Sequence, residues 1–227
     1  MMQLISLQPS RVALYGYAHV PWMSRRQQMI PSDAMPTPEE RLRLFVIASD
    51  MLVKAGYQAI GIDHFALPSD GLAVAANAGQ LRRNFQGYTD DTAEVLIGIG
   101  ASSISRFAQG YAQNASRTAD YAKAIGAGQF SVHRGHCFSP DDRLRGAMIE
   151  QLMCEFRIDR ARIVQRLGYA PPALDALLHQ THSAFHRVTS LDDAGLKVSA
   201  KAAPLIRLIA RALDAYDMGK GQHCAAI

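Results

Sequence analysis

The run VLIGIGASSIS, residues 95–105, most constrains what this chain can fold into. Its first half is apolar and rich in strand-favouring residues, and it then breaks at Gly98 and Gly100. This pattern predicts a buried strand that leaves its sheet through a tight turn. Because glycine has no side chain, such a turn lets backbone approach a ligand closely. Taken by itself, the spacing fits a plain strand-to-loop transition equally well.

A strand, a helix and a second strand are predicted nearer the N-terminus. Residues 11–17 have the composition of a strand, and residues 38–54 form a helix for which Thr37 is a natural N-cap. Residues 59–62 follow as a short buried strand. This order normally means two parallel strands joined by a right-handed crossover, so the sequence predicts an α/β fold.

Asp63 and His64 directly follow the second strand. In α/β barrels, polar residues at this end of a strand face the cavity where the chemistry occurs, so the pair is a candidate for acid/base work. In the alternative, Asp63 only accepts backbone hydrogen bonds in the turn that leads to Pro68. The sequence leaves both interpretations open.

Composition restricts the class of protein. The chain has 227 residues, of which 48% are hydrophobic and 19% are charged, enough to bury a sizeable core. Its formal charge of +4 permits an anionic partner but does not choose between nucleic acid, a membrane surface and a polycarboxylate. No apolar run approaches the roughly 18 residues that span a bilayer, and no signal peptide is visible, so we expect a cytoplasmic protein with no membrane partner.

The cysteines and histidines give little sign of a metal centre. Cys137, Cys154 and Cys224 are odd in number and widely spaced, which predicts reduced thiols. His133 and His136 lie beside Cys137, but no fourth ligand is near, and neighbouring strand positions point to opposite faces. We therefore predict no metal site in these residues.

The chain becomes mainly helical after Ser139. Helices are expected over residues 139–156, 159–167, 171–185 and 199–216, with a small hairpin around residues 188–198. This order resembles a winged helix, which raises DNA binding as a rival function. The candidate recognition helix disfavours it, because Asp175 and neutral residues stand where a DNA reader would carry Arg, Lys, Asn or Gln.

Five short segments of the sequence, taken in order, carry a resemblance to a known family. They read GYAHVPW (16–22), IGIDHFA (60–66), RNFQGYT (83–89), IGIGASSIS (97–105) and YAQN (111–114). Together they resemble the C-terminal half of oxygen-independent coproporphyrinogen III oxidase, a radical S-adenosylmethionine enzyme of haem and porphyrin biosynthesis. The resemblance covers essentially the whole chain.

The resemblance implies a fold and an activity. It places the C-terminal part of a partial TIM-like radical SAM barrel at residues 1–114, followed by a helical, winged-helix-like domain at residues 115–227. The family is an oxidoreductase that uses S-adenosylmethionine and a [4Fe-4S] cluster. A 5'-deoxyadenosyl radical takes hydrogen from two propionates of coproporphyrinogen III, and loss of carbon dioxide leaves the vinyl groups of protoporphyrinogen IX.

The resemblance also assigns roles to residues. Ala18 and Ile104 would face the adenosine of S-adenosylmethionine, with Gly98 and Gly100 opening the space beside it. Ala18 is alternatively small because a neighbour lies close, and His19 is either a proton-transfer group or a structural histidine. No residue is identified as catalytic.

The propionates of the substrate need cations, and the planar fork of arginine suits a carboxylate. Arg83 is the preferred partner, although it could equally be a solvated surface arginine. The residues expected to bind substrate are Arg83, Asn84, Gln86, Tyr88, Asp63 and His64.

One departure limits these expectations. The family holds its cluster in a C-x-x-x-C-x-C loop, and this chain contains none. We therefore expect the cluster-binding half upstream of Met1 or encoded separately, covering the exposed edges of a half barrel, and the chain alone to be inactive. The alternative is a non-catalytic remnant that binds a tetrapyrrole or regulates. A relative that handles haem would show a Soret shift on binding it.

Overall fold

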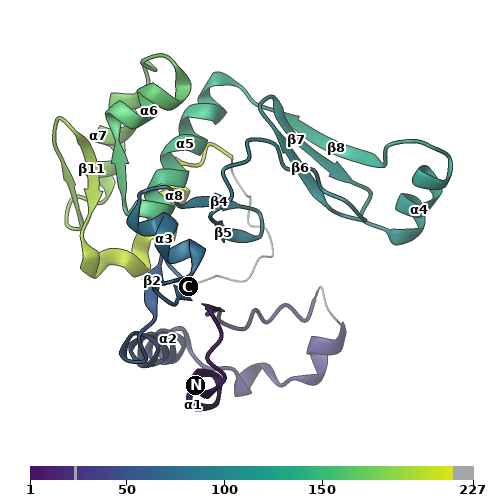
Figure 1. Ribbon diagram of the computed structural model, residues 1–227, viewed down its shortest axis with the longest axis horizontal. Coiled ribbons are helices and arrows are strands. Elements are labelled where there is room, and N and C mark those ends of the chain that lie inside the picture. Colours follow the sequence, from purple (N-terminus) through teal and green to yellow (C-terminus); the bar gives the residue numbers. More distant parts are fainter. Residues whose placement is uncertain (23–24, 217–227) are drawn as a thin grey trace.

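The structure is a computed structural model that describes residues 1–22 and 25–216, and it has an α/β fold (Figure 1). Its described strands form four small sheets, three of three strands and one of two. All neighbouring strands in these sheets pair antiparallel. The two strands predicted to be parallel, at residues 11–17 and 59–62, are therefore not hydrogen-bonded neighbours.

The N-terminal sheet shows why these two strands are not neighbours. It consists of β1 (Arg11–Ala13), β2 (Gln58–Ile60) and β3 (His64–Ala66), in the order β1-β3-β2. β1 and β2 do run in the same direction, because each pairs antiparallel with β3. The tight turn at residues 61–63 folds β3 back between them, in the place that a parallel neighbour would occupy.

Helix α2 (Pro38–Lys54) begins where the sequence predicts. The Thr37 hydroxyl accepts a hydrogen bond from the Glu40 amide at 3.2 Å, and the Glu40 carboxylate accepts one from the Thr37 amide at 2.8 Å. This reciprocal capping box satisfies two amides at the helix start. Leu52 is the buried residue of the helix, while several apolar side chains lie exposed: Leu42, Leu44, Val46, Ile47 and Val53.

The other N-terminal helices are short. They are α1 (Met2–Ser6), the 3₁₀ helices η1 (Arg25–Met29) and η2 (Ser32–Ala34), and α3 (Gly71–Asn77). Asp70 caps α3 by accepting a hydrogen bond from the Leu72 amide at 2.8 Å.

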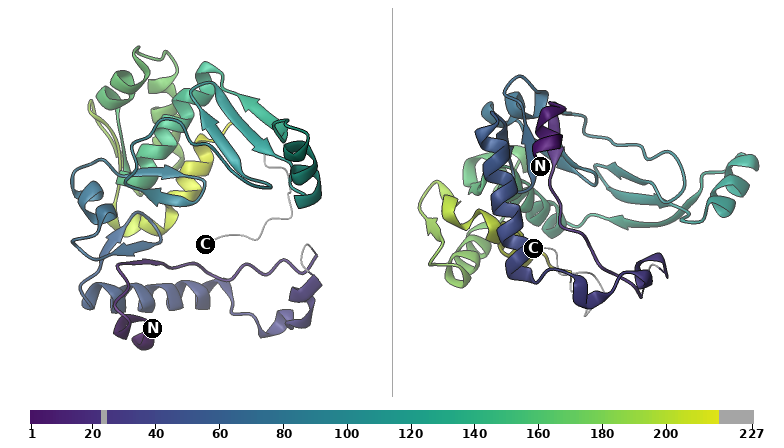
Figure 2. Two further views of the ribbon diagram at one scale, coloured as in Figure 1. Left: turned by 45° about the vertical axis from the view of Figure 1, so that its right-hand side comes forward. Right: turned by 90° about the horizontal axis from the view of Figure 1, so that it is seen from below.

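A hairpin and an arm follow α3. The hairpin is β4 (Arg82–Asn84) and β5 (Gly87–Thr89), and β4 packs against α5. The arm is the sheet β6 (Ile104–Phe107), β7 (Gly110–Asn114) and β8 (Val132–Cys137), with helix α4 (Thr118–Gly126) at its far end. Figures 1 and 2 show that the arm projects away from the rest of the molecule. The predicted domain boundary between residues 114 and 115 falls within it and stays a prediction.

The run at residues 95–105 is not a buried strand. Leu96 forms a single bridge to Arg106, while Ile97 and Ile99 are 68% and 85% exposed. Hydrogen bonds from Asn114 to the Gly98 and Gly100 carbonyls also hold this run against the arm, and it joins a sheet only at Ile104, where β6 begins. The predicted tight turn is present, with positive φ at Gly100 and Ser102.

The C-terminal elements enclose the largest core. They are the helices α5 (Pro140–Glu155), α6 (Arg160–Leu167), α7 (Leu174–Ala184) and α8 (Ile206–Leu213), the 3₁₀ helix η3 (Ala200–Leu205), and the sheet of β9 (Arg157–Asp159), β11 (Gly195–Val198) and β10 (Thr189–Leu191). Fully buried members of the core include Met148, Leu152, Ile163, Leu178 and Ile209. The single helix predicted over residues 199–216 is wrong. Pro204 lacks an amide hydrogen, and the chain forms η3 before α8 begins.

Within the part of the chain that the structure describes, no helix is both long and apolar enough to cross a membrane.

Candidate functional site

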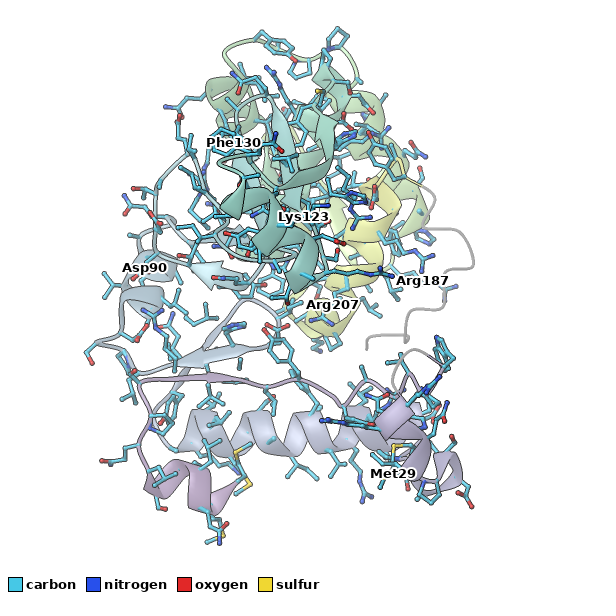
Figure 3. The ribbon with its side chains drawn as sticks, turned by 90° about the vertical axis from the view of Figure 1, so that its right-hand side faces the viewer. Met29, Asp90, Lys123, Phe130, Arg187 and Arg207 are labelled. Carbon is cyan, nitrogen blue, oxygen red and sulfur yellow. The ribbon has the colours of Figure 1, made fainter. Side chains whose placement is uncertain are left out.

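Asp63 and His64 lie beyond the carboxyl end of β2, where the sequence places them. The Asp63 side chain is only 6% exposed. One carboxylate oxygen lies 2.6 Å from His64 Nδ1, and the other accepts a hydrogen bond from Arg207 Nη2 at 2.5 Å. Figure 3 shows Arg207 on the C-terminal helix, facing the N-terminal segments. The buried carboxylate thus joins the N-terminal sheet to α8, and side chains rather than turn amides are its partners.

The His64 ring is held in a defined orientation. It makes edge-to-face contacts with Tyr15 and Tyr88, with centroid distances of 5.8 and 5.2 Å. Gly87 approaches so closely that a Cβ there would lie 3.2 Å from His64 Nε2. When Nδ1 donates to Asp63, Nε2 carries the free lone pair and can accept a proton or hydrogen bond.

The Tyr88 hydroxyl already makes two hydrogen bonds within the protein. It donates to the Met153 carbonyl at 2.8 Å and accepts from the Ile62 amide at 3.2 Å. Burial raises the pKa of Tyr88 well above its ordinary value, so the hydroxyl stays protonated. Tyr88 was predicted to hydrogen-bond the substrate, but these contacts make it a residue that positions the β4–β5 hairpin.

Arg83, on the β4–β5 hairpin, is a cation that could bind a ligand. The Arg83 guanidinium carbon lies 5.6 Å from the centre of the Tyr88 ring, and Arg83 Nε is buried without a hydrogen-bond partner in the described part of the chain. Asn84 accepts a hydrogen bond from the Gln86 amide at 2.8 Å, which fixes the turn, and Gln86 is exposed. Among the described residues, Arg83 therefore places a buried donor without a hydrogen-bond partner beside a cavity, which Asn84 also lines.

Ala18 lines a cavity of about 210 Å³. This volume is below the roughly 300 Å³ at which ligand pockets usually begin, so the cavity suits part of a ligand. Its wall combines apolar, aromatic and charged groups: Leu14, Tyr15, Tyr17, Phe45, Ile62, Asp63, Arg41 and Arg207 are among the lining residues. Arg41 Nε is buried here without a hydrogen-bond partner among the described residues.

Ile104 lies in the arm, Gly98 and Gly100 lie in the run that leads into it, and none of the three lines the Ala18 cavity. The Gly98 amide donates to the Ser105 hydroxyl at 3.0 Å, and a Cβ on Gly98 would lie 2.8 Å from the Ile104 carbonyl oxygen. The glycine therefore permits close packing of the arm backbone. The structure does not bring the four predicted cofactor residues together in this cavity.

The described residues do not fit an iron–sulfur cluster. Within residues 1–22 and 25–216, no group of three or more His, Cys, Asp or Glu side chains is placed to hold a metal ion. Cys137 is exposed on β8, Cys154 is buried in α5, and Cys224 lies outside the described residues. A cluster of this kind needs converging thiolates.

Two further histidine candidates, His136 and His19, have partners within the protein, and His133 is exposed on β8. His136 Nε2 lies 3.0 Å from the Tyr216 hydroxyl and 3.3 Å from Asp142. The hydrogen bond from Tyr216 is the main cause of an Asp142 pKa well below its ordinary value. His19 Nε2 lies 3.0 Å from the Ser32 hydroxyl.

Sequence analysis missed two arginines of the site. Arg207 lies 144 residues from the carboxylate that it binds, and Arg41 lies on a helix that looks like any charged surface helix. No motif or spacing marks either residue. Only the folded structure reveals them.

Comparison with known proteins gives a consistent result. No family model matches the chain. The oxygen-independent coproporphyrinogen III oxidase of Paracoccus denitrificans is 54% identical over 225 residues, which is 99% of this chain and 50% of that protein. The Escherichia coli protein of the same name is 35% identical over 94% of this chain and 47% of its own length.

A solved structure agrees with these sequences. It is that of Escherichia coli coproporphyrinogen III oxidase, described as a radical SAM enzyme, with a TM-score of 0.87 and 33% identity. The match covers 95% of this chain and 50% of the solved one. The chain therefore spans about half the length of the relatives that it matches.

Proposed function

We propose that this chain is the counterpart of the C-terminal half of an oxygen-independent coproporphyrinogen III oxidase and that it forms the substrate-binding half of such an enzyme. The observation that carries the proposal is 54% identity over 99% of the chain. The proposed reaction converts two propionates of coproporphyrinogen III to vinyl groups. Each ionised propionate loses one hydrogen atom to the radical derived from S-adenosylmethionine, one carbon dioxide, and one electron to a one-electron acceptor.

The proposed cofactors are S-adenosylmethionine and a [4Fe-4S] cluster, which together supply the hydrogen-abstracting chemistry. The described residues offer no thiolate set for the cluster, so we assign its ligands to the other half of the enzyme. The Ala18 cavity suits the adenine part of the cofactor, since a small residue and aromatic walls leave room for a flat ring. Ile104, Gly98 and Gly100 would border the cofactor from the arm.

The substrate residues have distinct proposed roles. Arg83 binds a propionate, and Asn84 and Gln86 shape the turn beside it. The Asp63–His64 pair presents Nε2 of an oriented imidazole near the substrate, held by Arg207. Tyr88 supports both groups from beneath, because its ring contacts His64 and Arg83.

The finer description of the fold is also a proposal. The N-terminal part, residues 1–114, would complete a partial radical SAM barrel together with the other half. Residues 115–227 would form a helical, winged-helix-like domain, which is supported by the β10–β11 hairpin that follows α7.

Reconstitution tests the function. The purified chain is mixed anaerobically with the cluster-bearing half of the Paracoccus denitrificans relative, a reductant, S-adenosylmethionine and coproporphyrinogen III. We expect release of about two carbon dioxide molecules per substrate only when both halves are present. Arg83→Gln should raise KM about tenfold, which corresponds to 1.4 kcal/mol of binding energy. Arg117→Gln, an exposed arginine on the arm, serves as the control.

Two results would overturn the proposal. One is decarboxylation by the chain without the other half. The other is a stable complex of the two halves that contains its cluster but does not turn over. Tight haem binding with a Soret shift in that case would favour the non-catalytic tetrapyrrole-binding alternative.

A further inference from the structure

A second, larger cavity lies between β4, the arm, α5 and α6. It has a volume of about 520 Å³, within the usual range for ligand sites. Five arginines line it, against three carboxylates: Arg82, Arg83, Arg106, Arg143 and Arg166, with Glu94, Asp142 and Glu150. The cavity is therefore cationic.

The carboxylates neutralise only part of this charge. Glu150 forms ion pairs with Arg82 at 3.0 Å and with Arg166 at 2.6 Å. The Asp142 carboxylate is engaged by the Tyr216 hydroxyl at 2.7 Å and by the amide and hydroxyl of Ser139. The carboxylates of Glu150 and Asp142 therefore already have partners within the protein.

Three arginines are left without an ion pair in the described part of the chain: Arg83 on β4, Arg106 on β6 and Arg143 on α5. Arg83 Nε is in addition buried without a hydrogen-bond partner. A buried donor without an acceptor is unfavourable, because it has lost its hydrogen bonds to water and gained none in the protein. An anionic ligand would supply the missing acceptor.

Aromatic rings form one wall of the cavity. Phe85 and Tyr111 meet edge to face at 4.9 Å, and Tyr111 and Phe138 meet at 4.7 Å. Phe85 comes from the hairpin, and the other two rings come from the arm and from the residue after it. Such a wall is complementary to the flat face of a pyrrole ring.

We propose that this cavity is a carboxylate clamp for a porphyrinogen, in which Arg83, Arg106 and Arg143 bind propionates and the aromatic wall carries a pyrrole ring. The inference rests on the proposed function, which supplies the ligand class, and it adds Arg106, Arg143 and the aromatic wall to the site. The three cations come from three elements, so the clamp recognises the spacing of carboxylates. Propionates held here anchor the substrate.

Direct binding tests the clamp. Coproporphyrin III, the stable oxidised form of the substrate, is titrated into the full chain and followed by its fluorescence. Arg106→Gln/Arg143→Gln should raise Kd at least about tenfold, and the tetramethyl ester of coproporphyrin III should bind the unmodified chain comparably weakly. The matched control is Arg117→Gln/Arg187→Gln, which removes two exposed arginines outside the cavity and should leave Kd unchanged. Arg187 lies at the edge of the molecule (Figure 3).

Three outcomes would overturn the clamp. They are no binding of coproporphyrin III, equal binding of acid and ester, and unchanged affinity in the cavity variant when its thermal unfolding matches that of the control. The reconstituted decarboxylation assay separates this inference from the proposed function. If the cavity variant turns over with an unchanged KM, the clamp is wrong and the proposed function stands. If coproporphyrin III binding depends on Arg106 and Arg143 but the unmodified halves do not turn over, the clamp stands and the proposed function is wrong.

Discussion

Asp63 shows how one residue can connect distant parts of this chain. Its carboxylate is buried and contacts both His64 and Arg207. A buried acid is stable only with hydrogen-bonding partners, because desolvation strongly disfavours an isolated charge. The orientation of His64 and the docking of α8 therefore depend on the same group.

We expect Asp63→Asn to lower the free energy of unfolding by about 2 kcal/mol, because it removes two charge-assisted hydrogen bonds at nearly constant shape. Urea unfolding measures the change. In a double-mutant cycle with Arg207→Gln, the coupling energy should lie in the range of about 0.5–3 kcal/mol. Asp193→Asn, on an exposed turn, should change stability by less than about 0.5 kcal/mol. A coupling energy near zero would show that Arg207 does not support Asp63.

At the same scale, the sequence identified one side of the site. Asp63 and His64 could be predicted because a short strand ends directly before them. Arg207 could not, because its role depends on how α8 docks against a hairpin far away in the chain. The hydrogen bonds of the Tyr88 hydroxyl could not be predicted for a related reason, since its partners, Ile62 and Met153, lie elsewhere in the chain; its role toward the substrate stays a prediction.

At the level of elements, Glu150 joins α5 to its neighbours. Its side chain is 11% exposed and forms ion pairs with Arg82 on β4 and Arg166 on α6. Burial alone would raise the pKa of Glu150, but Arg166 and Arg82 outweigh burial and hold this pKa below its ordinary value of 4.5. A lowered folded-state pKa stabilises the protein above the unfolded-state value, and this contribution is lost as the pH falls through the folded-state value.

Glu150→Gln should therefore reduce stability at neutral pH and weaken the loss of stability on acidification. The free energy of unfolding, measured by urea titration at about pH 7 and about pH 3, gives both quantities. Glu39→Gln, an exposed residue at the start of α2, should retain the pH dependence of the unmodified chain. An equal slope for Glu150→Gln and the unmodified chain would contradict the assignment.

Helices were easier to predict than strands for a physical reason. Thr37 and Ser139 both form capping boxes within four residues, so local sequence decides where α2 and α5 begin. Strands need a partner. The apolar run at residues 95–99 forms a single β-bridge and no strand. The insertion of β3 between β1 and β2 depends on the turn at residues 61–63.

For the whole molecule, burial is distributed unevenly. Helix α4 and strand β8 bury none of their residues, whereas α5 buries seven. Local opening costs least where few apolar contacts must break. The arm should therefore open more readily than the helical core.

Hydrogen–deuterium exchange followed by peptide mass spectrometry tests this difference. Peptides from α4 should exchange faster than peptides from α5. Mixing with the cluster-bearing half of the relative provides a comparison, because any surface that it covers will gain protection. Equal protection of α4 and α5 in the chain alone would be inconsistent with the exposure of the arm.

Most strand pairs in this chain join neighbours in sequence: β2 with β3, β4 with β5, β6 with β7, and β10 with β11. Such hairpins close short loops, and contacts of this kind form quickly. During synthesis, each hairpin can therefore form soon after it leaves the ribosome. Strand β1 pairs with a strand about 50 residues later and β9 with one about 40 residues later, so the N-terminal sheet and the C-terminal sheet are each completed after their own hairpins have formed.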